Sequence, residues 1–354
     1  MRYVNSRVAG TFSVAVGVVL ALPACSAPGT QLEASPPIAV LRVSAPIHAP
    51  VYSFDNDRLL GLTEDKRIAS VDATGPAGSG PADTSFSPML ADVGRNFQIS
   101  PYDSGIALVP QPALNRVAEV KVSDLRPVGA FAAGPTPSYV SQDSGANYLL
   151  ALSADRSTVT AVDLHRNDIL GSQAIATPPP ESTIEGAQRG RVVEFHVLGS
   201  GGISHYKGHT MPVEMHGELP VSVEAAVGDP TKVSRAYLAE KGTDKLVAVD
   251  SNHGRESLEI VGTASVGEPI RAVAVDDTRI YAATDSKLVV LQTNAFGGYP
   301  DARIPTLRTF DYRSELPRGP AASASVSGLA AGRHHVFLTL DGVPFVVRVA
   351  KPHV

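Results

Sequence analysis

Apolar and polar positions alternate in a unit that spans residues 228–250, with the sequence GDPTKVSRAYLAEKGTDKLVAVD. The pattern predicts a strand over residues 233–240, a turn over residues 241–244 and a second strand over residues 245–250. Apolar residues of the second strand alternate onto both of its faces. Each face therefore needs a neighbouring sheet to cover it.

This unit returns along the chain. Clear copies occupy residues 137–163 and 269–291, and looser copies occupy residues 51–72, 97–122 and 326–349. Pro230 and Pro269, which open two successive units, are 39 residues apart. A period of about 40 to 45 residues with several strands per unit is typical of a β-propeller.

The strand clusters predict one all-β domain, a β-propeller of seven blades with four strands in each. The blades are expected at residues 44–90, 92–133, 134–176, 178–227, 228–266, 267–318 and 319–354. The last blade has only three strand patterns of its own, whereas residues 39–43 form an apolar strand without a partner. We expect this N-terminal strand to complete the last blade and close the ring.

The repeat has a recognisable order of residues: Pro230, Tyr237, Leu238, Leu246, Val249, Asp250, Val266 and Gly267. It resembles the YVTN-type repeat of bacterial, surface-layer-like seven-bladed propellers. The sequence departs from that repeat directly after Tyr237, so the resemblance implies the fold and carries over no specific activity. The chain contains no Trp, which disfavours WD-type and quinone-cofactor propellers.

The first 24 residues have the pattern of a secretory signal, with Arg2 and Arg7 before an apolar run at residues 14–22. The sequence Leu-Pro-Ala-Cys that ends at Cys25 resembles a bacterial lipobox, whose cysteine is diacylated and becomes the mature N-terminus. Cys25 is the single cysteine of the chain, and lipidation accounts for a lone thiol outside the cytoplasm. A cleaved secreted protein and an uncleaved membrane anchor are the alternatives.

The expected organisation is a lipoprotein signal peptide (1–24), lipidated Cys25 with a flexible tether (25–37) and a single propeller domain (38–354). Removing the signal takes away two of the 30 basic residues, which leaves 28 basic and 35 acidic residues and a formal charge of −7. This charge argues against a nucleic-acid partner and against electrostatic binding to anionic lipid. We expect acyl chains on Cys25 to hold the protein at the cell membrane, facing outside the cytoplasm.

Residues 177–219 depart most from the repeat, and four of the ten histidines lie there. If residues 199–202 form a hairpin loop, His196 lies opposite His205 and Glu194 lies opposite Lys207. Such a group is a candidate Zn²⁺ site. The candidate ligands are Glu194, His196, His205 and His209, with His216 as another fourth donor. The alternative is that Glu194 pairs with Lys207 and that the histidines are ordinary half-exposed strand residues.

Catalytic motifs are missing from the sequence, which has no GxSxG, no phosphate-binding loop and no HExxH. Charged residues at the expected turns are assigned to turn chemistry: Asp55, Asp57, Asp143, Arg156, Asp276, Asp277 and Arg279. Two loops, at residues 75–88 and 294–316, are long for blade connections. The second is a candidate binding loop through Phe296, Tyr299, Arg303, Arg308 and Tyr312. The alternative is a loop folded over the blade on its own aromatic residues.

Together these features predict a lipid-anchored, extracytoplasmic propeller that acts without catalysis, as a binding or scaffolding protein of the cell envelope. Its partners are the membrane, through Cys25, and an envelope protein or a permease. A first alternative is a zinc-binding accessory protein that serves a permease, similar to propeller-type zinc chaperones. A second is a propeller hydrolase or lactonase, which needs polar residues and a divalent ion at the axis.

Overall fold

The computed structural model describes residues 37–75, 81–142, 147–175, 183–186, 192–231, 235–252, 257–294 and 298–352. Residues 37–354 form one compact unit. Cys25 and the expected signal and tether up to residue 36 lie outside the described residues. Within the described part of the chain, no helix is long and apolar enough to cross a membrane.

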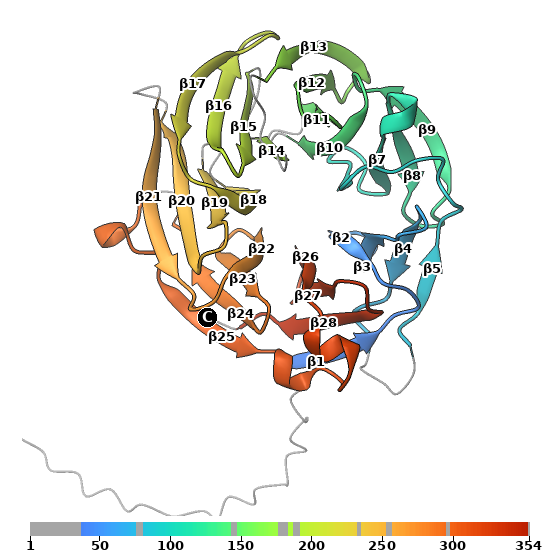
Figure 1. Ribbon diagram of the computed structural model, residues 1–354. Helices are drawn as coiled ribbons and strands as arrows, with labels where there is room; N and C mark the ends of the chain where they lie inside the picture. Colours follow the sequence, from blue (N-terminus) through green and yellow to red (C-terminus); the bar gives the residue numbers. More distant parts are fainter. Residues whose placement is uncertain are drawn as a thin grey trace, which may run out of the picture. The chain divides into compact units, whose positions relative to one another are not determined.

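The unit is a ring of seven four-stranded antiparallel sheets, as the repeat predicts (Figure 1). Blade one holds β2 (His48–Ser53), β3 (Arg58–Leu62), β4 (Ile68–Val71) and β5 (Thr84–Phe86). Blade two holds β6 (Gln98–Ile99), β7 (Ile106–Gln111), β8 (Arg116–Lys121) and β9 (Pro127–Ala132). Blade three holds β10 (Pro137–Gln142), β11 (Tyr148–Ser153), β12 (Thr158–Asp163) and β13 (Asp168–Ala174). Blade four holds β14 (Thr183–Gly186), β15 (Val193–Gly199), β16 (Gly202–Gly208) and β17 (Glu214–Leu219).

Blade five holds β18 (Val223–Gly228), β19 (Arg235–Glu240), β20 (Lys245–Asn252) and β21 (Ser257–Ser265). Blade six holds β22 (Ile270–Val275), β23 (Arg279–Thr284), β24 (Lys287–Gln292) and β25 (Thr306–Asp311). Blade seven holds β26 (Val326–Ala331), β27 (His335–Leu340), β28 (Phe345–Ala350) and β1 (Ile38–Arg42). Short 3₁₀ helices lie at Pro112–Leu114, Pro300–Ala302, Arg313–Glu315 and Pro320–Ser323.

The ring closes where the sequence predicts it. Strand β1 pairs antiparallel with β28, from Ile38 opposite Val349 to Arg42 opposite Phe345. Blade seven therefore combines three C-terminal strands with one N-terminal strand. The pairing joins segments from the two ends of the propeller and leaves blade seven with the same four strands as its neighbours.

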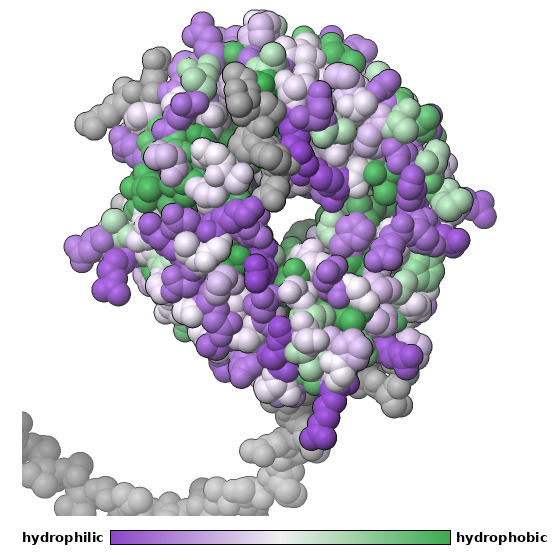
Figure 2. Space-filling model, viewed as in Figure 1, coloured by the Kyte–Doolittle hydropathy of each residue, from purple (hydrophilic) through white to green (hydrophobic). Residues whose placement is uncertain are grey.

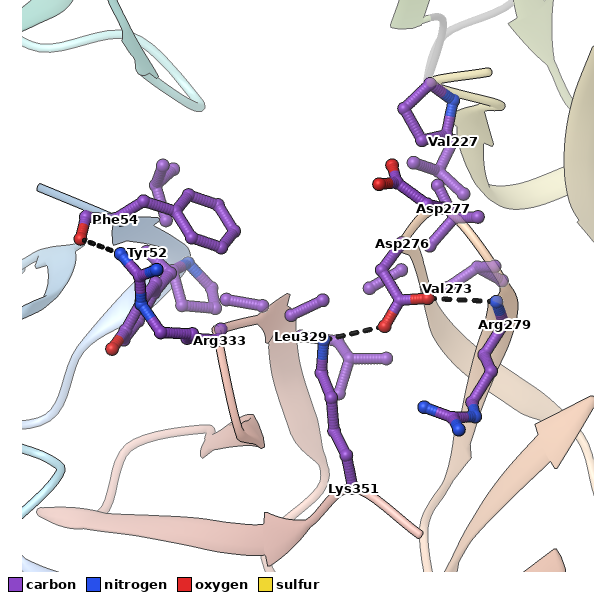
Figure 3. A pocket seen from close by; sticks show the side chains of 18 of the residues that line it. Tyr52, Phe54, Val227, Val273, Asp276, Asp277, Arg279, Leu329, Arg333 and Lys351 are labelled. Atoms are coloured by element: carbon purple, nitrogen blue, oxygen red, sulfur yellow. Dashed lines mark hydrogen bonds and ion pairs between the residues drawn. The ribbon is translucent and has the colours of Figure 1, made fainter. Parts of the chain in front are cut away.

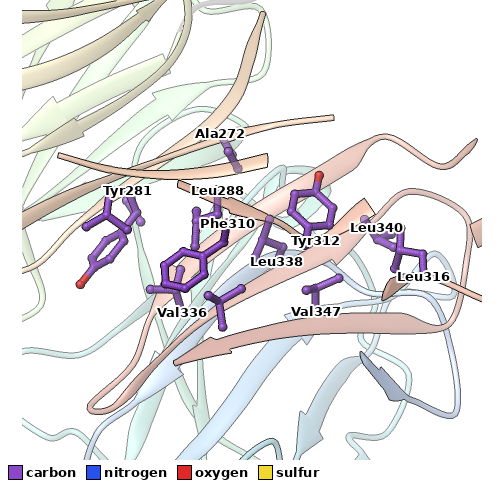
Figure 4. Packing of buried hydrophobic residues seen from close by; sticks show 14 residues of the cluster. Ala272, Tyr281, Leu288, Phe310, Tyr312, Leu316, Val336, Leu338, Leu340 and Val347 are labelled. Carbon is purple, nitrogen blue, oxygen red and sulfur yellow. The ribbon is translucent and has the colours of Figure 1, made fainter. Parts of the chain in front are cut away.

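The described residues form seven apolar clusters, one between each pair of adjacent blades. Figure 4 shows the cluster between blades six and seven, where Tyr281 and Leu288 meet Val336 and Leu338. All four side chains are almost fully buried. This arrangement explains why the strands of the repeat are apolar on both faces, because each sheet is covered on both sides.

The repeated tyrosine has a defined role in two blades. Tyr237 donates a hydrogen bond to Asp229 at 2.6 Å, and Tyr281 donates one to Asp276 at 2.7 Å. Each aspartate directly follows the first strand of its blade, and its other carboxylate oxygen accepts a backbone N–H from the following turn. The tyrosine therefore fixes the turn that leads from the first strand to its own strand.

The prediction that residues 75–88 and 294–316 are long loops is partly wrong, because each range contains a strand. Residues 75–88 include β5, and residues 294–316 include β25, each the outermost strand of its blade. The first three residues of β25, Thr306, Leu307 and Arg308, are all exposed, so the strand lacks the apolar alternation that identified the others. An outermost strand covers little core, which is why its sequence carries a weak strand signal.

The closing strand gives the first prediction. Leu41 in β1 is 6% exposed and packs in the cluster between blades seven and one. Replacing it with alanine is expected to lower the free energy of unfolding by about 2 to 4 kcal/mol, measured by urea denaturation. The neighbouring Arg42 is exposed, so Arg42→Ala serves as the matched control. Equal effects of the two substitutions would show that β1 does not contribute to the core.

Candidate functional site

A cavity of about 760 Å³ opens at one end of the ring. This end is the first-turn face, defined by the turns that join the first and second strands of each blade, such as residues 54–57, 276–278 and 332–334. Among the described residues, the lining comes from blades one, two, five, six and seven and from Lys351. Figure 2 shows an opening at the centre of the ring, surrounded by many hydrophilic side chains.

The wall of this axial pocket is mostly aliphatic. Its apolar lining residues are Pro50, Val51, Val227, Pro230, Val273, Ala274, Val275, Leu329, Ala330 and Ala331. They belong to the first strands or follow directly after them, and these strands lie innermost in the ring (Figure 1). Polar and aromatic groups are concentrated where the first strands end, at Tyr52, Phe54, Asp276, Asp277 and Arg333.

Asp276 is engaged within the protein. Lys351 Nζ lies 2.6 Å from its Oδ2, which also accepts the hydroxyl of Tyr281, while its Oδ1 accepts the backbone N–H groups of Thr278 and Arg279. Burial acts to raise the pKa of Asp276, but these hydrogen bonds and the ammonium of Lys351 outweigh it, so the pKa is lowered. Asp276 therefore stays ionised and holds the turn.

Asp277 and Arg333 carry opposite charges on the rim of the axial pocket (Figure 3). Both are exposed, and neither takes part in an ion pair with another described residue. Arg333 Nη2 donates a hydrogen bond to the carbonyl oxygen of Phe54 at 3.0 Å. Phe54 is 51% exposed, and in Figure 3 its ring and the Asp277 carboxylate point into the opening from opposite sides.

The histidine hairpin has the predicted register. His196 lies opposite His205, and Glu194 lies opposite Lys207. The two imidazoles stack with ring centroids 5.0 Å apart. His205 Nε2 donates to Glu194 Oε1 at 2.9 Å, and Lys207 Nζ lies 3.7 Å from Glu194 Oε2. The expected pairing of Glu194 with Lys207 is therefore present, together with a hydrogen bond to His205.

The expectation that these histidines are half-exposed is wrong, since His196 is 2% and His205 4% exposed. The face of blade four that carries them packs against blade five, where the Ser251 hydroxyl donates to Glu194 Oε1 at 3.2 Å. His209 is exposed, beyond the end of β16. The ring of His216 lies 6.2 Å from that of His205, measured between centroids.

His196 stacks on His205 in this interface, but neither of its ring nitrogens has a hydrogen-bond partner among the described residues. Burial lowers its pKa to about 3, and the neighbouring His205 adds to this, while Glu194 acts in the opposite direction. In the described part of the chain, no group of three His, Cys, Asp or Glu side chains is arranged to hold a metal ion.

The position of His196 corresponds to that of the repeated tyrosine. Tyr237 and Tyr281 each face the next-to-last residue of the first strand, and His196 faces Glu185 at that same position in blade four. Where blades five and six have a tyrosine and blades one, three and seven have Leu59, Leu150 and Phe337, blade four has a buried imidazole. This difference is one way in which residues 177–219 depart from the repeat.

Glu185 was not identified from the sequence. Its carboxylate accepts hydrogen bonds from the Ser141 hydroxyl of blade three at 2.8 Å and from the Gly228 N–H of blade five at 3.3 Å. It thus connects the first strands of three successive blades. Burial raises the pKa of Glu185 to about 7 against the effect of both hydrogen bonds. The sequence signal that could have identified Glu185 is its position between Ile184 and Gly186, a carboxylate within a short innermost strand.

Most aromatic residues of the predicted binding loop lie inside the protein. Tyr299 and Tyr312 are buried, and the Tyr312 hydroxyl donates to the carbonyl oxygen of Thr284 at 2.6 Å. Arg303 and Arg308 are exposed. Phe296 lies outside the described residues. The described aromatics follow the alternative, a segment packed onto its own blade, and leave the two arginines as the accessible part.

Comparisons with known proteins support the propeller fold and show no family or activity. No family model and no curated protein sequence matches the chain. Among solved structures, a chain in the crystal structure of the mitotic checkpoint complex is similar, with a TM-score of 0.66 at 12% identity over 96% of this chain and 99% of that one. The structure of U3-55K is similar with a TM-score of 0.64 at 10% identity, covering 89% and 98%. At such identities the likeness shows the propeller fold alone.

The buried His196 gives a prediction about pH. Between its ordinary pKa of 6.5 and its native value of about 3, the unfolded chain binds a proton at this residue that the native chain does not. The free energy of unfolding therefore falls as the pH is lowered through this window. We expect the drop in the free energy of unfolding from pH 6.5 to pH 5, measured by urea denaturation, to be smaller in His196→Gln than in the natural chain. The difference should be up to about 2 kcal/mol.

Glu185 changes stability in the opposite direction over part of this range, but it does so in both chains and cancels in the comparison. His209→Gln, at an exposed position, is the matched control and should keep the pH dependence of the natural chain. The same loss in His196→Gln and in the natural chain would contradict a neutral, buried imidazole.

Proposed function

We propose that this chain is a lipid-anchored, extracytoplasmic propeller that binds a partner at its first-turn face, around the axial pocket. The single observation that carries the binding site is the rim of that pocket. Asp277 and Arg333 present opposite charges there without ion pairs among the described residues, and Phe54, which is 51% exposed, lies beside them. Exposed aromatic and arginine side chains around a concavity are typical of binding surfaces.

The location rests on the N-terminal sequence. Residues 1–24 have the pattern of a secretory signal, and Cys25 ends a lipobox-like sequence. Acyl chains on Cys25 and the Pro- and Ser-rich segment after it would hold a rigid ring near the membrane. The resemblance of the repeat to YVTN-type propellers agrees with such an extracytoplasmic protein. A tethered ring with variable turns suits a scaffold of the cell envelope.

A hydrolase or lactonase is supported less. Such an enzyme needs carboxylates that converge on a divalent ion at the axis. Of the two acidic residues that line the described pocket, Asp276 has both carboxylate oxygens occupied by the protein itself. Asp277 alone does not form a metal site of this kind.

Site-specific photo-cross-linking in intact cells tests the proposal. A photo-reactive phenylalanine analogue replaces Phe54 on the first-turn face, and a matched variant carries it at Val128, which is 58% exposed on the outer strand β9. A discrete adduct is expected from position 54 and not from position 128. The lipid anchor is tested on cells that are not irradiated, where the natural chain is expected in the membrane fraction and Cys25→Ser should move the protein to the soluble fraction.

Equal adducts from both positions would contradict a binding site at the axial pocket. A Cys25→Ser protein that stays in the membrane fraction without irradiation would contradict the lipid anchor and leave the binding site intact. The two parts of the proposal are thus tested separately.

Zinc delivery to a permease is the second candidate, and one observation favours it. The hairpin brings His196, His205 and Glu194 together inside the ring, and His196 has neither ring nitrogen hydrogen-bonded to a described residue. Zinc coordination would require these side chains to leave their present arrangement, in which His205 donates to Glu194. Imidazole and carboxylate are ligands that Zn²⁺ accepts.

Elemental analysis and zinc titration calorimetry on the full chain test this candidate. Zinc handling predicts a stoichiometric ion that is lost in the His196→Ala, His205→Ala double variant and kept in His334→Ala, a control at an exposed position. Far-UV circular dichroism checks that each variant is folded. Zinc no higher than background in the natural chain would refute the candidate.

A further inference from the structure

Five charged residues among those described line the axial pocket: Asp276, Asp277, Arg279, Arg333 and Lys351. Lys351 and Asp276 form an ion pair at 2.6 Å, in which the side chain of Lys351 is 12% exposed and that of Asp276 is 22% exposed. Of the other three charged residues, Asp277 and Arg333 are exposed, whereas Arg279 is half-buried. Asp277 and Arg333 are therefore the accessible charges of the described lining. A ligand that satisfies both must therefore carry one positive and one negative group.

These two groups lie on adjacent blades, with aliphatic surface between them. Asp277 is on the turn after β22 and Arg333 is on the turn after β26. The first strands themselves contribute Val273, Val275 and Leu329 to the pocket. In Figure 3, Leu329 is drawn between Arg333 and the two aspartates, and Val273 is drawn on the side of Asp277. The ligand should therefore have an apolar part between its two charges.

Other ligand classes match this lining less well. A sugar presents many hydroxyl groups that need donors and acceptors, which aliphatic walls do not supply. A nucleic acid would bring phosphates towards Asp277 and towards a mature chain of formal charge −7. A lipid acyl chain would leave Asp277 and Arg333 without partners in a partly desolvated site. A peptide can supply both charges and an apolar side chain from successive residues.

We propose that the axial pocket receives a peptide segment of a partner protein, an inference that rests on the proposed binding function. In this segment a basic and an acidic residue flank an apolar residue. The basic side chain reaches Asp277, the acidic side chain reaches Arg333, and the apolar side chain lies against Val273 and Leu329. Phe54, half-exposed at the rim, covers the apolar side chain. The pocket volume of about 760 Å³ suits a few side chains and not a folded domain.

A displayed library of random ten-residue peptides tests this assignment. The full chain, produced without lipid, is immobilised through its single cysteine, Cys25. Enriched peptides are expected to carry a basic and an acidic residue on either side of an apolar one. Their retention should fall about tenfold or more on Asp277→Lys and on Arg333→Glu, because each variant places a like charge opposite the peptide.

The matched control is Arg126→Glu, which changes the charge equally at an exposed arginine outside the pocket lining and should retain the peptides. The double variant Asp277→Lys, Arg333→Glu should recover binding to peptides synthesised with their two charges exchanged. Enriched peptides without the charge pattern, or with equal retention on the single variants, would overturn the assignment.

The outcome is distinguishable from failure of the proposed function. A cross-link from position 54 combined with no enriched peptide, or a cross-linked partner that is a glycan or a lipid, would remove the peptide assignment and keep the binding site. Absence of both the cross-link and the enrichment would remove both.

Discussion

Each sheet of this protein has two apolar faces, and the structure depends on covering both of them. A linear row of such sheets would leave one face exposed at each end, whereas a ring leaves none. Closure requires the first and last blades to meet, and the pairing of β1 with β28 joins the two ends of the domain at that place. The seven interfacial clusters, the order of the strands and the position of the axial pocket all depend on this closure.

Polar residues inside the ring are tolerated where the fold supplies their partners. Arg235 is 2% exposed and forms a two-point pair with Asp250, with nitrogen–oxygen distances of 2.7 and 2.9 Å. The repeated tyrosines likewise find aspartates of their own blades. In blade four, His196 occupies the position of these tyrosines and has no hydrogen-bond partner among the described residues. A buried polar group without a hydrogen bond lowers the stability of the fold. Such a cost at the interface of blades four and five is of the kind that proteins accept at functional sites.

The first-turn face is free of the demands that govern the interior. Its turns need only to reverse the chain, and a few local hydrogen bonds, such as those to Asp276, are sufficient for that. Neighbouring side chains such as Asp277, Arg333 and Phe54 are then available for recognition. In the proposed binding role, a rigid ring with exposed turns around one concavity separates the requirements of folding from those of binding.

The sequence by itself determined the number of blades, the closing strand and the register of the histidine hairpin, because apolar alternation and turn residues are local signals with a fixed period. It missed the outermost strands β5 and β25, where little apolar surface is buried. Only the tertiary structure decided which side chains are buried between blades and which meet at the axis. His196 and His205 lie on one face by local register, but the packing of blade five buries them. Asp277 and Arg333 are 56 residues apart in the chain and reach one pocket because adjacent blades converge there, which no local pattern encodes.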